Sequence, residues 1–206
     1  MKEALKNCGK ANRIALYGGA FNPIHNGHLA TIGLLLASQN FDQVLVIPSG
    51  DRPDKIVGVS AAQRLEMTTL AVTEAFPGDQ RVVVSDIHAR GLVGYGTIDL
   101  IDHFQARPNV ACFVVIGHEL LSELHAWKES ERLLSIARFI VIHRPGSPMP
   151  NTPQGVDATT LPSPYPAGVL VSSSTVRNLI AQGLSCAGLV PPSVIRFCVS
   201  NGLYNN

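Results

Sequence analysis

Two histidines lie close together in a glycine-rich stretch near the N-terminus of the sequence, YGGAFNPIHNGHLA (residues 17–30). His25 and His28 are three residues apart at the expected start of a helix, so both imidazoles can face one site of phosphate size. Gly18 and Gly19 let the backbone approach a ligand closely, and a helix N-terminus presents free N–H groups to an anion. The stretch predicts a phosphate-binding site, although it is neither the dinucleotide fingerprint nor a P-loop. The alternative is a simple turn with Asn26 as the helix cap and two surface histidines.

A second group of polar residues, VSSSTVRNLI (residues 171–180), lies near the other end of the chain. Ser172, Ser173 and Ser174 stand at an expected helix N-terminus, where they could be ordinary caps. Arg177 is expected in the first turn, where a cation opposes the helix dipole unless it points at a bound anion. Together the two motifs predict a clamp that closes on one triphosphate.

Alternating strands and helices must position these motifs. Nearly continuous apolar runs predict strands covered on both faces, at residues 13–17, 43–47, 81–85, 110–116, 139–143 and 168–171. Helices are expected between them, near residues 26–39, 60–76, 97–106, 118–136 and 173–182; Ser60 and Gln63 form a capping box at the start of the second. This alternation predicts an α/β fold with a doubly wound parallel sheet, in which ligands bind beyond the carboxyl ends of the strands.

The 206 residues are expected to form a single domain, with residues 1–11 as an N-terminal extension. The proline-rich residues 144–167 show no periodicity and are predicted to form a long loop, of the kind that often acts as a flap or lid. The sequence leaves open whether the chain forms a homo-oligomer.

Composition excludes several classes of partner. With 46% hydrophobic and 15% charged residues the chain is expected to be well folded, and its net charge of +1 gives no field that would attract nucleic acid or a membrane. The four cysteines are scattered without C-x-x-C spacing, which is typical of a reducing compartment. Because no stretch has the length of a signal peptide or membrane span, a soluble, cytoplasmic protein is expected.

The first motif resembles a known family. GGAFNPIHNGHL is similar to the signature GG-x-F-[DN]-P-[IV]-H-x-GH of nucleotidyltransferases, and within them to bacterial nicotinate-mononucleotide adenylyltransferase. The resemblance implies a Rossmann-like nucleotidyltransferase fold. It also implies that Gly18, Gly19 and Phe21 belong to the ATP site, and that His25 and His28 contact the ATP phosphates and stabilise charge as pyrophosphate departs.

Two further stretches extend the implied ATP site. VSSSTVR resembles the family's I-S-S-T-x-I-R, which implies that Ser172, Ser173, Ser174 and the catalytic Arg177 hold ATP phosphates and help to bind the adenine ribose. PSGDRPDK (residues 48–55) takes the place of P-x-x-x-P-P-H-K, so Lys55 is implied to reach a phosphate.

The implied site for the second substrate is less complete. GYGTIDL (residues 94–100) is similar to S-Y-T-x-x-T-L beside the mononucleotide, which places Tyr95 and Thr97 there. IGHELL followed by Trp127 is similar to G-x-D-x-L…W, with Glu119 for the Asp and Trp127 as a platform for the pyridine ring. His118 and His125 are seven apart and do not form H-E-x-x-H, so no zinc or other resident metal site is expected.

The resemblance implies adenylyl transfer from ATP to nicotinate mononucleotide, forming deamido-NAD and pyrophosphate in NAD biosynthesis. Mg²⁺ is implied to arrive with ATP, since the sequence shows no dedicated carboxylate cage. The acid mononucleotide is preferred over nicotinamide mononucleotide. Two alternatives stay open: adenylyl or cytidylyl transfer to another phosphorylated acceptor such as phosphopantetheine, and a diverged paralogue that binds a nucleotide without turnover.

Overall fold

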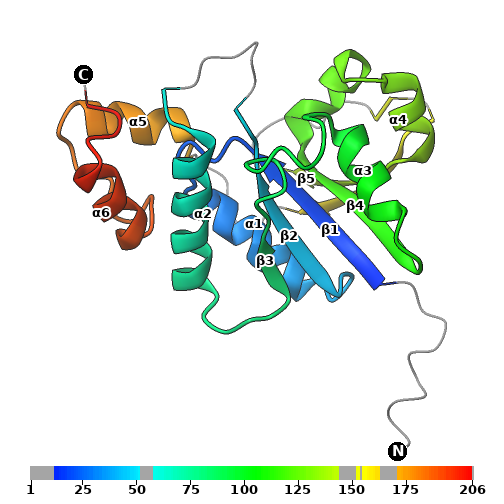
Figure 1. Cartoon of the computed structure of the whole chain (residues 1–206), viewed down its shortest axis with the longest axis horizontal. Coiled ribbons are helices and arrows are strands. Elements are labelled where there is room, and N and C mark those ends of the chain that lie inside the picture. The colour runs from blue at the N-terminus through cyan, green and yellow to red at the C-terminus, as the bar shows by residue number, and fades with distance from the viewer. Residues whose placement is uncertain (1–11, 52–57, 144–151, 154, 163–170, 206) are drawn as a thin grey trace, which may run out of the picture.

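A computed structural model describes residues 12–51, 58–143, 152–153, 155–162 and 171–205. Six parallel strands form a sheet in the order β3-β2-β1-β4-β5-β6 (Figure 1). They are β1 (Asn12–Gly19), β2 (Gln43–Pro48), β3 (Val82–Val84), β4 (Val110–Gly117), β5 (Arg138–His143) and β6 (Asp157–Pro162). The predicted doubly wound sheet is confirmed, and the strand order reverses between β1 and β4, which makes that position the topological switch point.

Helices cover both faces of the sheet because successive strand residues point to opposite sides. Ala15 of β1 packs in one apolar cluster, while its neighbours Ile14 and Leu16 pack in another. The first face is covered by α1 (Asn26–Ala37) and α2 (Ala61–Ala75). Helices α5 (Ser173–Ala181) and α6 (Pro192–Ser200) extend the same apolar cluster, with α6 packed against α2 (Figure 1). The second is covered by α3 (Thr97–Gln105), the 3₁₀ helix η1 (His118–Ala126) and α4 (Ser130–Ile136).

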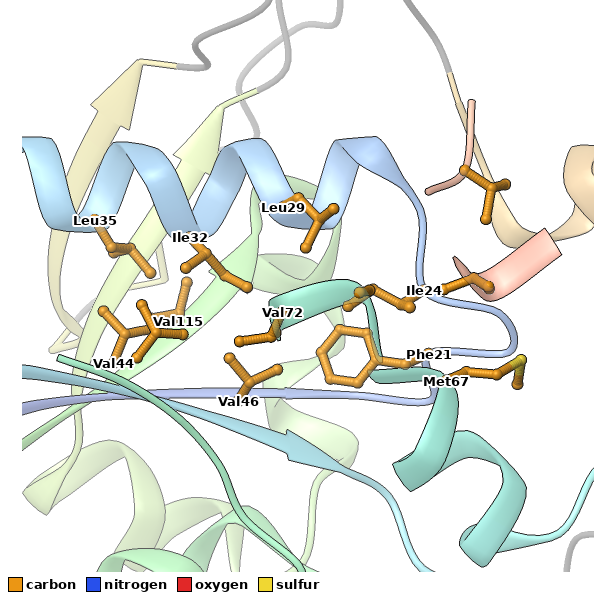
Figure 2. Packing of buried hydrophobic residues seen from close by; sticks show 14 of the residues in the cluster. Phe21, Ile24, Leu29, Ile32, Leu35, Val44, Val46, Met67, Val72 and Val115 are labelled. Atoms are coloured by element: carbon orange, nitrogen blue, oxygen red, sulfur yellow. The ribbon is translucent and has the colours of Figure 1, made fainter. Parts of the chain in front are cut away.

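The helix that carries the first motif is fixed by its apolar stripe. Leu29, Ile32 and Leu35 of α1 lie on one face of the helix and point toward Val44, Val46 and Val115 of the sheet (Figure 2). Full burial of such a side chain stabilises the fold by about 1.5–3 kcal/mol. The start of α1 is therefore held rigidly beside the carboxyl end of β1.

The predicted capping box of α2 is confirmed. Ser60 is the N-cap, its Oγ accepts a hydrogen bond from the Gln63 N–H at 3.3 Å, and the Gln63 Oε1 accepts one from the Ser60 N–H at 3.0 Å. None of the helices in the described part of the chain is long and apolar enough to span a membrane.

The prediction of a single helix at residues 118–136 is wrong. η1 ends at Ala126, Trp127 is extended with φ −76° and ψ 157°, and Glu129 has a φ of 50° before α4 begins. Ion pairs of Lys128 with Asp99 and of Arg132 with Asp102 hold this segment against α3. The residues that form these ion pairs are far apart in sequence, so the apolar periodicity does not reveal the break after Ala126.

The prediction of a long loop at residues 144–167 is also wrong in part. β6 lies inside it and pairs in parallel with β5 from Arg138 opposite Asp157 to His143 opposite Pro162. Val156 and Ala158 pack against the apolar cluster beneath, which is why this segment joins the sheet. Of the strand expected at residues 168–171, only Val171 is described and it is not in a strand; residues 1–11 lie outside the described part.

Candidate active site

The two histidines of the first motif are stacked at the start of α1. Their ring centroids are 3.7 Å apart with an angle of 20° between the planes, and the His25 N–H donates a hydrogen bond to Nδ1 of His28 at 3.2 Å. Because Nδ1 accepts, neutral His28 carries its proton on Nε2 and can donate it to an anion. The helix cap is His25 and not Asn26, because His25 is extended and the helix begins at Asn26. The Asn26 side chain instead donates to the Gly188 carbonyl at 2.8 Å.

Phe21 supports this pair from the side of the β1–α1 loop. Its ring is fully buried and meets the His28 ring edge-on at a centroid distance of 4.9 Å. The Phe21 φ of 45° lies in the left-handed region, a strained conformation that often marks a functional site. A Cβ on Gly19 would lie 2.9 Å from the Phe21 ring, so the open backbone here makes room for Phe21.

A first cavity of about 160 Å³ opens at the topological switch point. It is smaller than most small-molecule sites, which span about 300–1,000 Å³, and so fits part of a nucleotide. Its walls combine polar groups from α1 and η1 with apolar side chains from the sheet. They are Tyr17, Gly18, Gly19, Phe21, His28, Thr31, Val115, Ile116, Gly117, Glu119, Leu120 and Ile142.

The serines of the second motif begin α5. Ser172 is the N-cap, and its Oγ accepts a hydrogen bond from the Thr175 N–H at 3.1 Å. Ser173 Oγ donates to the Pro23 carbonyl in the first motif at 2.9 Å. The capping interpretation therefore holds for Ser172, while Ser173 ties one motif to the other.

Arg177 makes a second tie between the two motifs. Its Nη1 donates to the Asn22 carbonyl at 2.8 Å and its Nη2 donates to Ser174 Oγ at 3.1 Å. Because α5 begins at Ser173, Arg177 is the fifth helical residue and lies just beyond the first turn where it was expected. The guanidinium thus stands between two loops that each present groups suited to phosphate.

The C-terminal segment completes this arrangement. The Tyr204 hydroxyl donates a hydrogen bond to Asn22 Oδ1. Burial raises the pKa of Tyr204, so its hydroxyl stays protonated and remains a donor. Asn22 is therefore held through its backbone by Arg177 and through its side chain by Tyr204.

A second cavity of about 560 Å³ lies between the start of α3 and the break after η1. Its lining residues are Gly94, Tyr95, Gly96, Thr97, Asp99, Ala126, Trp127 and Lys128. Three of the four residues expected to bind the mononucleotide, Tyr95, Thr97 and Trp127, are thus brought together. Glu119 is not among them, since it lines the first cavity. η1 connects the two cavities, with Glu119 near its start and Trp127 just after its end.

His88 is buried behind the second cavity, with its ring centroid 6.4 Å from that of Tyr95. Burial lowers the pKa of His88, and the nearby Gly94 carbonyl and the charge of Asp99 oppose this effect without cancelling it. Neither ring nitrogen makes a well-aligned hydrogen bond within the described residues. This imidazole is therefore a neutral packing group at ordinary pH.

The model of the cytidylyltransferase-like family matches residues 16–179, most of the chain and both motifs. The chain belongs to this family. A protein of Synechococcus sp. (strain JA-2-3B'a(2-13)) named probable nicotinate-nucleotide adenylyltransferase is 33% identical over 95% of the chain and 98% of its own length. A Thermus thermophilus protein of the same name is 32% identical over 93% of the chain and 99% of its own length.

Solved structures share the fold of this cytidylyltransferase-like chain. The nicotinic acid mononucleotide adenylyltransferase of Plasmodium falciparum, in complex with NaAD, superposes with a TM-score of 0.81 at 20% identity. The match covers 94% of this chain and 97% of that one. The similarity supports the same Rossmann-like arrangement of sheet and helices.

The described residues of this cytidylyltransferase-like chain do not form a resident metal site. No group of three or more His, Cys, Asp or Glu side chains able to hold a metal occurs among them. The residues that line the first cavity include an imidazole and hydroxyl groups, with Glu119 as the carboxylate, a set that suits an anionic phosphate better than a cation. Lys55 lies outside the described residues.

Sequence reasoning missed several residues that shape the two cavities. Tyr204 is not among the predicted site residues, and its bond to Asn22 spans 182 positions. Asp99 lies within the stretch singled out for the mononucleotide, and Lys128 follows Trp127 directly, yet neither was given a role. The sequence signal available for Asp99 and Lys128 was their closeness in the chain to Tyr95 and Trp127.

Proposed function

We propose that the chain transfers an adenylyl group from ATP to nicotinate mononucleotide, releasing pyrophosphate and forming deamido-NAD. One observation carries this proposal: Arg177 bonds to the Asn22 carbonyl and so joins the serine motif to the histidine motif at the switch point of the sheet. The names of relatives that are about a third identical over nearly the whole chain support it.

In the proposed reaction the 5′-phosphate of the mononucleotide attacks the α-phosphorus of ATP in line with the departing pyrophosphate. The nucleophile is already an anion, so no general base is required. Rate enhancement then comes from orientation and from stabilisation of charge on the phosphate oxygens. His28 donates from Nε2, and Arg177 and His25 contribute further donors or positive charge. Gly18, Gly19, Phe21, Lys55 and the three serines shape the ATP site.

We propose that Mg²⁺ enters with ATP and is held mainly by phosphate oxygens and water, as is usual for this ion. Bound in this way, it would neutralise part of the phosphate charge. The residues of the chain bind and orient the phosphates around it. Chelation of the metal should therefore abolish turnover, while the melting temperature of the nucleotide-free protein stays unchanged.

The second cavity is the proposed site of the pyridine mononucleotide. Its volume of about 560 Å³ fits a small ligand, and Trp127 can stack on the ring while Tyr95 and Thr97 face the same space. Glu119 lies on the wall of the first cavity, so its negative charge does not line this one. That placement removes the charge of Glu119 from the wall that the acid mononucleotide would face.

Pyrophosphate release from ATP should be measured with nicotinate mononucleotide, nicotinamide mononucleotide and phosphopantetheine as acceptors. The proposal expects the highest kcat/KM with the acid mononucleotide. Faster reaction with phosphopantetheine would assign another acceptor, and binding of ATP without turnover on any acceptor would indicate a non-catalytic paralogue.

We also propose a cytoplasmic setting, which the free thiols of Cys112, Cys186 and Cys198 support.

A further inference from the structure

An ion pair forms part of the wall of the second cavity. Nζ of Lys128 lies 2.7 Å from Oδ1 of Asp99, and both residues line the cavity beside Trp127. The pair joins the start of α3 to the break after η1, two segments that are 29 positions apart. The Lys128 side chain is about half exposed, and Lys128 is one of the residues that line the cavity.

Lys128 and Asp99 differ in how many of their hydrogen-bonding groups have partners. Oδ1 of Asp99 accepts from Lys128, and Oδ2 accepts from the Gly96 N–H at 2.9 Å. Burial by itself would raise the pKa of Asp99, but the hydrogen bonds from Lys128 and Gly96 outweigh it, so the pKa is lowered and the carboxylate stays charged. An ammonium has three donors, and Asp99 occupies one. Lys128 therefore has further donors on this wall, while each Asp99 oxygen already accepts one hydrogen bond.

The wall formed by Lys128 and Asp99 can discriminate between a pyridine ring that carries a carboxylate and one that carries a carboxamide. A carboxylate on the ring accepts hydrogen bonds only, whereas a carboxamide must also place two N–H donors. The Asp99 hydrogen bond is the largest cause of a raised pKa for Lys128, and the charges of Glu129 and Asp102 add to it, so the ammonium stays protonated. A charge-assisted bond from this ammonium strengthens binding of the acid, whereas the neutral amide brings no charge to pair with it.

We propose that Lys128 is a specificity-determining residue that binds the ring carboxylate of the acid mononucleotide, and that Asp99 positions its ammonium. This assignment rests on the proposed function, because it takes the second cavity as the mononucleotide site. It adds a side-chain cation to a pocket in which the sequence pattern indicated Trp127 as a platform for the ring.

The test compares kcat/KM for nicotinate and nicotinamide mononucleotide in Lys128→Met and in the unaltered protein. Loss of one hydrogen bond to a charged group should reduce the acid value by about 10- to 100-fold. The amide value should stay the same or rise, because Asp99 then has an oxygen free to accept from the carboxamide. Equal losses for both substrates, or no loss for the acid, would overturn the assignment.

Three further variants separate specificity from general damage. Lys128→Arg should restore most of the acid preference, since it keeps a donor cation. Asp99→Asn should lower the acid preference, because it weakens the contact that positions the ammonium. Arg132→Gln is the matched control: Arg132 pairs with Asp102 and Glu129 and does not line the second cavity, so any loosening of the contact with α3 should change both values to the same extent. A substrate-selective effect of Arg132→Gln would contradict the assignment.

Fluorescence of Trp127, the sole tryptophan of the chain, reports binding without turnover. Nicotinate mononucleotide should quench it, with a Kd that rises by about 10- to 100-fold in Lys128→Met. If the unaltered protein binds the acid in this Lys128-dependent way but makes no dinucleotide, the proposed function fails and the binding role of Lys128 stands. If it makes the dinucleotide and Lys128→Met binds the acid as tightly as before, only the role of Lys128 fails.

Discussion

The guanidinium of Arg177 donates a 2.8 Å hydrogen bond to the backbone carbonyl of Asn22, across 155 positions of sequence. This bond connects the loop of the histidine motif to the helix of the serine motif before any ligand binds. Nη2 of the same group donates to Ser174 Oγ at 3.1 Å. Arg177 therefore holds the two halves of the proposed phosphate clamp in register as well as carrying positive charge.

We expect Arg177→Ala to lose both activity and stability. From the sequence alone, removing a cation near a helix N-terminus would leave stability unchanged or slightly higher. In the structure, the substitution removes the hydrogen bond from Arg177 to the carbonyl of the half-buried Asn22. This loss should lower the free energy of unfolding by about 1–3 kcal/mol. Urea unfolding and kcat/KM for ATP measure the two effects. Arg196→Ala, on the exposed side of α6, is the control, and a fully active, equally stable Arg177→Ala protein would refute the clamp.

His28→Ala should fold normally and lose about 10²–10³ in kcat, the effect expected from one donor that stabilises developing charge. His25→Ala should show a similar loss, part of it as weaker ATP binding. Steady-state kinetics with far-UV circular dichroism checks both variants. His125→Ala, an exposed residue outside both cavities, serves as the control. An unchanged kcat in folded His28→Ala would remove His28 from the chemistry.

Gly27→Ala should impair turnover through the histidine pair. A Cβ at this position would lie 2.9 Å from the His25 ring and 3.0 Å from Val171, so the ring must move off His28. Gly33→Ala provides a control on the same helix, because nothing lies within 4 Å of its added Cβ. It should stabilise α1 by about 0.5–1 kcal/mol and leave kcat unchanged. Comparable kcat values for the two variants would contradict the tight packing at Gly27.

His88 should make the protein less stable as the pH falls. Its pKa is lowered in the folded state, so below the unfolded value of about 6.5 the unfolded chain takes up a proton that the native state does not. The free energy of unfolding should therefore decline from about pH 7 downward until the folded pKa is passed. Urea unfolding at pH 7.5 and 5.5 should show a smaller decline for His88→Leu than for the unaltered protein or His125→Gln. An identical decline in all three would exclude this role of His88.

Much of the fold was predictable because local rules determine it. The apolar runs of β1 to β5 predict strands covered on both faces, and the order of strands and helices predicts a parallel sheet. The capping box of Ser60 and Gln63 uses atoms three residues apart, so the sequence displays it directly. The histidine motif was likewise recognisable, because the backbone that it needs is specified within one short stretch.

The sequence by itself determined the class of fold and the two polar motifs, since periodicity, capping and glycine content act over a few residues. Only the tertiary structure decided that Arg177 reaches Asn22, that Glu119 faces the first cavity, and that β6 joins the sheet. It also decided the break after Ala126 that opens the second cavity, where Lys128 meets Asp99. These features depend on hydrogen bonds, ion pairs and strand pairing between segments far apart in the chain, and such contacts leave no periodic trace in the segments that make them.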